Sequence, residues 1–157
     1  MLTFSTTLQV RRDAGFYGNP NVSDEQIDEI RKQAYDICRG IIAGRYNIAN
    51  IVPGGTGFDG SQAAGLLERA EILVAAGYLL SQEFGEEQMG QDFDGEKKIK
   101  SGKELLFQLF DSKNPIRLID ATGQEFPRVS VATESNDNGI VITISNTPRA
   151  FTIDQVF

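Results

Sequence analysis

Residues 61–84 read SQAAGLLERAEILVAAGYLLSQEF, and this stretch decides the fold. Its first half is amphipathic at helical spacing, whereas Ile72–Leu80 is apolar on every side of the predicted helix. Because a helix without a polar face has to be covered on most sides, this one is expected in a core, against a neighbouring subunit, or in both settings at once. The candidate subunit-packing residues are Ile72, Val74, Ala76, Tyr78 and Leu80.

A second helix is predicted over residues 24–45, ahead of this central one. Ser23 is an expected N-cap, and Gln26 stands three residues later, where it would close a capping box. Val22 and Ile27 are placed for a hydrophobic staple across the same helix start. The start signals therefore agree with the apolar positions that recur along this segment.

The C-terminal part mixes a third helix with strands. A helix is predicted over 94–111 and a short strand over 116–119, because Asn114-Pro115 breaks the helical pattern between them. Alternating segments flank Asn138-Gly139, and this dipeptide is a strong hairpin signal.

The chain ends are predicted to form additions to the helical part. Residues 3–10 are rich in Thr, Phe and Val, which favours a strand or an extended arm. The expected fold is mainly α with β additions, a bundle of three main helices with an extended N-terminal arm and a C-terminal β-hairpin. The predicted division is 1–22 for the arm, 23–120 for the helical domain, and 121–157 for the hairpin and tail.

Composition excludes several classes of protein. The 157 residues carry a net charge of −7, which opposes tight, sequence-independent binding to DNA and is compatible with DNA sliding past. A single cysteine, Cys38, excludes an internal disulfide. The apolar run Ile72–Leu80 is much shorter than the about 20 residues that a membrane helix needs. These features, with no signal-peptide pattern at the start, predict a soluble protein made in the cytoplasm and not held in a membrane.

The residues offer little equipment for catalysis. The chain has no histidine, so the commonest general base and metal ligand is missing. Cys38 lies on an apolar helix face, where a thiol without a base is inert. Glu68 and Glu71 are expected on a solvated helix face. We therefore expect no catalytic residue, no metal and no cofactor.

Two glycine-containing strings resemble ligand loops. The segment 55–60 matches the dinucleotide pattern G-x-G-x-x-G, but the residues before it make a poor strand and no second strand follows. The segment 92–95 has too few acidic ligands for a calcium loop. A plain loop and a helix start are the favoured interpretations.

Lysines gather on the third predicted helix against the overall charge. Lys97, Lys100 and Lys103 share one helical face. This stripe is either a solvated face or a docking surface for an acidic partner subunit or for passing DNA.

The order of these elements resembles that of the head–tail connector proteins of tailed phages, in the Mu-like and related versions. The resemblance covers roughly residues 22–120 and is carried by packing motifs. After the capped helix these motifs are Gly44-Arg45-Tyr46, the string from Leu67 to Glu71, the string from Ala75 to Leu80, Asp94 to Lys98, and Leu118-Ile119-Asp120.

The resemblance implies a helical adaptor or head-completion protein in the virion. Such a protein assembles as a homo-oligomeric ring, commonly twelve-membered, under the portal protein, and it extends the channel through which double-stranded DNA passes without sequence-specific binding. Loops and terminal arms then hold the portal and the stopper or tail proteins. Both ends of this chain depart from the family pattern, and extended arms suit strand addition to a partner. The candidate arm residues are Phe4, Leu8, Phe151, Ile153, Val156 and Phe157.

Three alternatives stay open. The first alternative is a tail-completion or other minor virion protein. The second is a small nucleotide-binding regulatory domain that uses the glycine loop 54–60. The third is a basic-helix DNA binder, and it predicts a steep salt dependence of DNA affinity.

Overall fold

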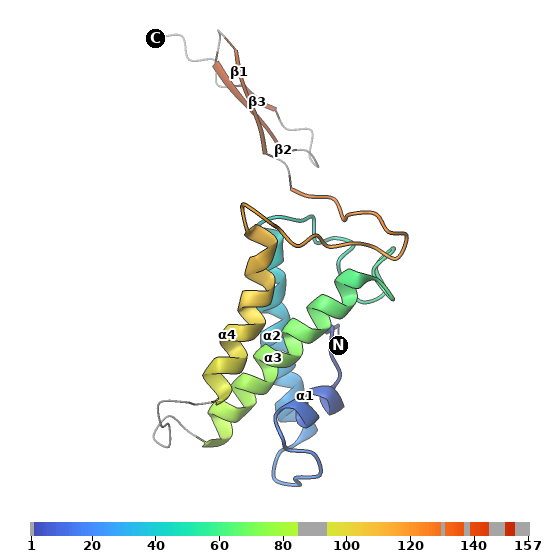
Figure 1. Cartoon of the computed structure of the whole chain (residues 1–157), viewed down its shortest axis with the longest axis vertical. Coiled ribbons are helices and arrows are strands. Elements are labelled where there is room, and N and C mark those ends of the chain that lie inside the picture. The colour runs from blue at the N-terminus through green and yellow to red at the C-terminus, as the bar shows by residue number, and fades with distance from the viewer. Residues whose placement is uncertain (1, 85–93, 130, 137–138, 145–149, 153–157) are drawn as a thin grey trace.

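The protein is mainly helical in its computed structural model, which describes residues 2–84, 94–129, 131–136, 139–144 and 150–152 (Figure 1). The helices are α1 (Thr7–Asp13), α2 (Asp24–Ala43), α3 (Gln62–Phe84) and α4 (Asp94–Phe107), and a 3-10 turn, Gln108–Phe110, extends α4. The backbone is extended in β1 (Val131–Asn136), β2 (Gly139–Ile144) and β3 (Ala150–Thr152).

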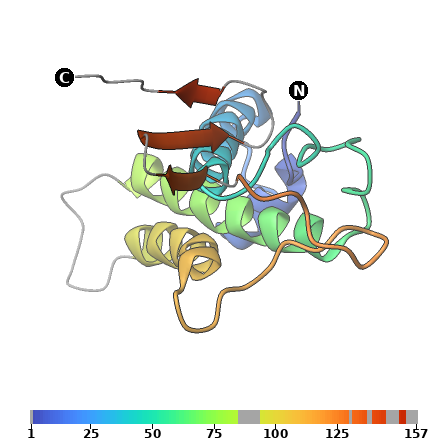
Figure 2. The same ribbon diagram turned by 90° about the horizontal axis from the view of Figure 1, so that it is seen from above.

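Helix α3 is the central element of the bundle. Figure 2 shows α2 and α4 on opposite sides of α3, and α1 packs against both α2 and α3. The apolar run is therefore covered inside one chain, and Val74 and Ala76 have no exposed surface. The core interpretation of residues 61–84 is confirmed, and the predicted helix begins one residue too early.

Helices α3 and α4 approach each other at two glycines. A Cβ atom added to Gly77 would lie 2.5 Å from the carbonyl oxygen of Gly95, and one added to Gly102 would lie 2.8 Å from that of Ala70. Real Cβ atoms do not come so close to backbone. The close packing of α4 thus requires a glycine inside the apolar run.

The prediction of a strand or an extended arm over residues 3–10 is wrong for residues 7–10, which are helical, whereas residues 3–6 lie in no helix or strand. Helix α1 begins at Thr7 because Thr6 and Gln9 close a full capping box, in which the Thr6 hydroxyl accepts from the Gln9 amide and the Gln9 side chain accepts from the Thr6 amide. Val10 and Ala14 then enter the core at helical spacing. The capping residues and this apolar pair outweigh the strand-like composition.

The start of α2 follows the sequence signals in part. The Ser23 hydroxyl accepts from the Gln26 amide at 3.1 Å, and Val22 and Ile27 are both buried. The Gln26 side chain donates to Glu83 at the end of α3 instead of closing the box. Helix α2 ends at Ala43, two residues before the predicted boundary.

The predicted strand over 116–119 is reduced to a single bridge between Ile119 and Glu125. Phe126 is buried beside Leu118, so the packed part of the chain extends beyond residue 120. Residues 137 and 138, where the predicted hairpin turns, lie outside the described residues, and the hairpin stays a prediction.

Candidate functional site

Tyr46, just after α2, is joined to the distant segment 118–125 by two hydrogen bonds. Its hydroxyl accepts a hydrogen bond from the Leu118 amide at 3.2 Å and donates one to the Glu125 carboxylate at 2.9 Å. Burial raises the pKa of Tyr46. Burial also raises the pKa of Glu125, but the bonds from Arg128 and Tyr46 outweigh this effect, so that the pKa of Glu125 is lowered. The site keeps a neutral phenol against a charged carboxylate.

Three of the five motifs that carry the family resemblance meet at this junction, whereas the buried residues of the string from Ala75 to Leu80 belong to the other core cluster. Leu67 and Ala70 of α3 pack in the same buried cluster as Tyr46 and Leu118. The Asn47 amide also donates to the Pro127 carbonyl at 2.8 Å, which fastens the loop after α2 to the segment before β1. Residues that lie far apart in the motif order therefore form one packed end of the bundle.

The glycine loop uses its polar groups internally. The Gly54 amide donates to both carboxylate oxygens of Asp59 at 3.1 Å, and the Gly57 carbonyl accepts from the Ala121 amide at 2.8 Å. The Asp59 carboxylate thus already occupies the Gly54 amide, which would otherwise be free to bind a phosphate. No strand precedes this loop in the part of the chain that the structure describes. The geometry favours a structural loop over a nucleotide site.

The lysine stripe lies on the outer face of α4, alternating with acidic residues. Lys100 pairs with Glu104 at 3.8 Å, and Lys103 is half-buried. A hollow of about 530 Å³ follows this face, lined by Glu96, Ile99, Lys100, Lys103, Glu104 and Phe107. Two lysines and two glutamates border the hollow, so this face is close to electrically neutral. The prediction of a shared face for Lys97, Lys100 and Lys103 is compatible with a helical α4, but the face is not strongly basic.

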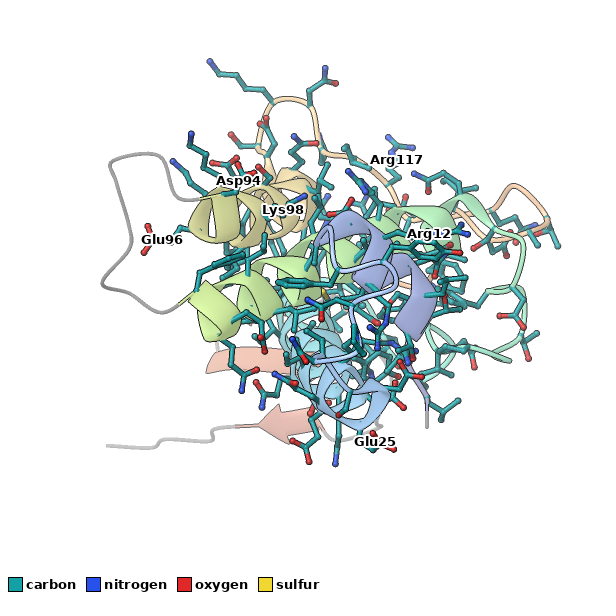
Figure 3. The ribbon with its side chains drawn as sticks, turned by 90° about the horizontal axis from the view of Figure 1, so that it is seen from below. Arg12, Glu25, Asp94, Glu96, Lys98 and Arg117 are labelled. Carbon is teal, nitrogen blue, oxygen red and sulfur yellow. The ribbon has the colours of Figure 1, made fainter. Side chains whose placement is uncertain are left out.

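Lys98 stands apart from that stripe. It pairs with Asp13 at the end of α1 at 2.8 Å, and Arg69 of α3 pairs with the same carboxylate at 3.0 Å. Although burial raises the pKa of Asp13, the bonds from Lys98 and Arg69 lower it overall. In Figure 3, Lys98 and Asp94 of α4 lie across the bundle from Glu25 of α2. Asp13 therefore fastens α1 to both α3 and α4.

The candidate subunit-packing residues of α3 differ in exposure. Ile72, Val74, Ala76 and Leu80 are buried by their own chain, with at most 9% exposed surface. Tyr78 is half-buried and lines a hollow of about 310 Å³ between α2 and α3. The contact with a neighbouring copy stays a prediction, and within this set Tyr78 is the side chain that reaches the surface.

The candidate arm residues fall into two groups. Phe4 packs on its own chain, with its ring centroid 4.8 Å from that of Tyr35 and 5.5 Å from that of Phe58. Leu8 is 46% exposed on α1 and remains available to a partner. The structure does not describe the side chain of Phe151, nor residues Ile153, Val156 and Phe157.

The expectation for Glu71 is wrong. Its side chain has no exposed surface and accepts hydrogen bonds from the Phe4 and Ser5 amides. Burial raises its pKa, and the bonds from Ser5 and Phe4 oppose that rise. Its position, at helical spacing from the buried Leu67 and Val74, is a sequence signal that would have placed it inside.

No protein-family model matches the chain, and comparison with curated proteins and with solved structures gives no match either. Among the described residues, no helix combines the length and apolar character needed to cross a membrane. The same residues contain no group of three or more acidic or cysteine side chains placed to hold a metal ion.

Proposed function

We propose that the protein is a non-enzymatic structural subunit of a tailed-phage neck. In this proposal it forms an adaptor ring that joins the portal to the stopper or tail proteins and extends the DNA channel of the virion. The observation that carries it is the Tyr46 junction, at which residues of the family-like motifs pack together. Tyr46, Leu67 and Leu118, from three of these motifs, are adjacent in space although they are far apart in the sequence.

The surface of α4 supports the passage of DNA without retention. Lysines alternate with Glu96 and Glu104 on this face, and the whole chain carries a net charge of −7. A protein that holds DNA through its phosphates needs unopposed lysines and arginines. An acidic ring with near-neutral outer helices lets DNA slide through it.

The ends of the chain provide the contacts with partners in this proposal. Leu8 is exposed on α1, and the predicted C-terminal hairpin with its apolar tail follows the packed part of the chain. A terminal strand can extend the sheet of a portal, stopper or tail protein, since unpaired backbone groups give affinity there. A tail-completion or minor virion protein would use the same ends without forming a ring.

The test is the assembly state of the purified protein, with and without the portal protein of the same phage. Native mass spectrometry should show a closed ring, or a monomer that forms rings only when the portal is added. Electron microscopy should then place the ring below the portal. A protein that remains monomeric and never joins a portal would overturn the proposal.

A matched pair of tyrosines sharpens the test. Tyr78 lines the hollow between α2 and α3, whereas Tyr17 is 67% exposed beside Arg12. Tyr78→Lys should weaken ring formation with the helical content unchanged by circular dichroism. Tyr17→Lys should leave the ring intact. If the two substitutions weaken ring formation equally, the hollow at Tyr78 is not part of the contact between copies.

A further inference from the structure

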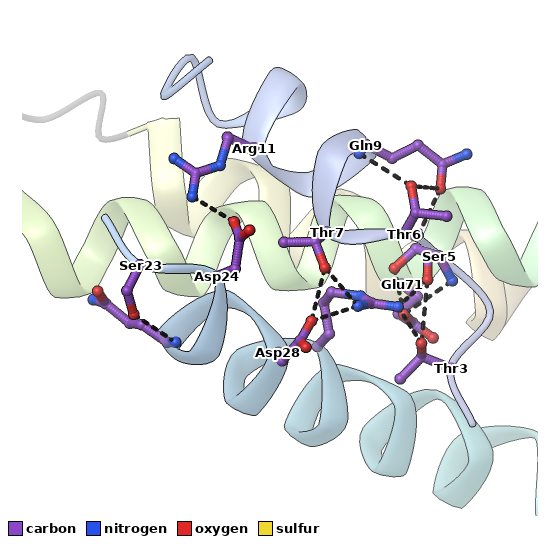
Figure 4. Close-up of polar contacts among 12 residues, drawn as sticks. Thr3, Ser5, Thr6, Thr7, Gln9, Arg11, Ser23, Asp24, Asp28 and Glu71 are labelled. Carbon is purple, nitrogen blue, oxygen red and sulfur yellow. Dashed lines mark hydrogen bonds and ion pairs between the residues drawn. The ribbon is translucent and has the colours of Figure 1, made fainter. Parts of the chain in front are cut away.

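Residues 3–7 are held by two buried charged side chains, one from each of two helices. Glu71 of α3 has no exposed surface, and Arg31 of α2 is 9% exposed. Figure 4 shows Thr3, Ser5 and Thr7 gathered around Glu71 and Asp28. The N-terminal segment therefore occupies a built polar site and does not merely lie on the bundle.

The carboxylate of Glu71 binds backbone and hydroxyl groups of that segment. It accepts from the Phe4 amide at 2.7 Å, from the Ser5 amide at 3.1 Å and from the Ser5 hydroxyl. Charge-assisted bonds of this kind are among the strongest in proteins. All three donors belong to two consecutive residues at a bend of the chain, so Glu71 binds this bent segment through its backbone.

The guanidinium of Arg31 completes the site from the opposite helix. It donates to the Thr7 hydroxyl at 2.9 Å, to the Thr3 hydroxyl and to the Ser5 carbonyl, and it pairs with Asp28 at 2.6 Å. The half-buried ring of Phe4 packs against the rings of Tyr35 and Phe58 beside these polar contacts. Backbone clamps around one aromatic anchor are a usual arrangement for peptide recognition.

The site formed by Glu71 and Arg31 needs a bound segment at all times. Without residues 3–7, Glu71 would lose every hydrogen bond that the structure gives it, and Arg31 would keep only Asp28. A buried charge without partners is strongly unfavourable. The requirement is chemical, however, and any copy of the same segment satisfies it.

The connection between α1 and α2 can reach a neighbour. Ala14, Phe16 and Val22 are buried in the core, so the part of the connection that can extend is residues 17–21, which span roughly 16 Å at about 3.3 Å per residue. Helix α1 has seven residues and is too short to be stable away from a docking surface. Arg11 keeps the connection folded back by donating to the Asn19 carbonyl at 2.9 Å and the Val22 carbonyl at 2.7 Å. Arg11 thus favours the arrangement in which α1 stays on its own chain.

We propose that the site formed by Glu71 and Arg31 also accepts residues 3–16 of a second copy, so that neighbouring subunits exchange their N-terminal segments. The inference rests on the proposed function for the closeness of the copies, since packing in a ring raises the effective concentration of each segment near the next site. Exchange keeps all contacts of Glu71 and Arg31, and Ala14 and Phe16 pack in the equivalent core positions of the neighbour. It gives up mainly the bonds from Arg11 to the Asn19 and Val22 carbonyls.

The ion pair between Asp13 and Lys98 gives a direct test in the full, unmodified chain. Unlabelled and ¹⁵N-labelled protein are mixed in urea, refolded together at high concentration and treated with a water-soluble carbodiimide. This reagent joins a carboxylate to an amine that contacts it, as these two do at 2.8 Å. Mass spectrometry of the Asp13–Lys98 cross-linked peptides then shows whether the two halves carry the same label.

Exchange predicts mixed-label peptides in the statistical ratio, and Arg11→Ala should raise their share wherever exchange is incomplete. Cross-links with a single label only, or a monomer as the only folded species by native mass spectrometry, would overturn the inference. The Lys98→Gln protein, which cannot form this cross-link, is the control. Rings without mixed labels would leave the neck proposal standing, whereas mixed-label dimers that never join a portal would remove the neck proposal alone.

Discussion

The Ser5 amide donates a hydrogen bond to the buried carboxylate of Glu71, 3.1 Å away and 66 residues further along the chain. Replacing Glu71 with Ala removes the acceptor and leaves the Phe4 and Ser5 amides unpaired. We expect the free energy of unfolding to fall by about 2–4 kcal/mol, because each buried donor left without an acceptor costs about 1–3 kcal/mol. Urea denaturation at neutral pH measures this loss. Glu104→Ala, at an exposed position of α4, is the control and should change stability by less than about 0.5 kcal/mol. Equal losses would show that the contact between Glu71 and Ser5 contributes little.

The same carboxyl group makes stability depend on pH. Burial raises the pKa of Glu71 above its ordinary value of 4.5 in the folded protein. Between the unfolded and folded pKa values the folded state binds more protons, so this contribution is complete below about pH 4.5. It is lost as the pH rises through the folded pKa. As the pH increases from about 4, the unfolding free energy of the natural protein should therefore fall relative to that of Glu71→Gln. A difference that stays constant with pH would contradict the burial of this group as a carboxyl that titrates.

Alanine substitutions at Gly77 and at Gly40 test the packing of α3 against α4, with Gly40 as the control. A Cβ at Gly77 would lie 2.5 Å from the Gly95 carbonyl oxygen and 2.9 Å from the Ile99 amide, and neither backbone atom can move cheaply. Gly77→Ala should destabilise the protein by about 1–3 kcal/mol despite the better helix propensity of alanine. Gly40→Ala in α2 meets nothing within 4 Å and should be neutral or stabilising. Thermal unfolding of both variants tests the close approach of α3 and α4.

Sequence periodicity predicts α2 and α3 well, because their caps and apolar faces are local features. The site around Glu71 is different, since a lone carboxylate in an apolar face is stable inside only when donors arrive from elsewhere in the fold. Those donors come from Phe4 and Ser5, in a segment whose Thr-rich composition favours a strand. Thr6 and Gln9 did carry a readable capping signal for α1. Which residues meet Arg31 and Glu71 depends on tertiary packing that no local pattern encodes.

Cys38 reports on the integrity of the bundle. Its thiol has no exposed surface, and burial raises the pKa of Cys38 to about 12. Because the thiolate is the reactive form, a disulfide reagent at pH 8 should label the native protein only as fast as the bundle opens. In urea the same reagent should label Cys38 completely and at once. Rapid labelling without denaturant would show that α2 does not pack against α3 and α4 as described.

The lysines of α4 distinguish a DNA channel from a DNA-binding helix. Lys100 and Lys103 line a face that also carries Glu96 and Glu104, and the chain has a net charge of −7. We expect little retention of double-stranded DNA at physiological salt. Any residual affinity should have a shallow salt dependence, because the slope grows by about 0.9 for each phosphate neutralised. Fluorescence anisotropy over a salt series should give the same result for the natural protein and for the double variant Lys100→Gln, Lys103→Gln. Lys113→Gln, in the exposed segment after α4, is the control. A steep slope that disappears in the double variant alone would favour the basic-helix DNA binder over the neck adaptor, since only unopposed lysines on α4 produce that result.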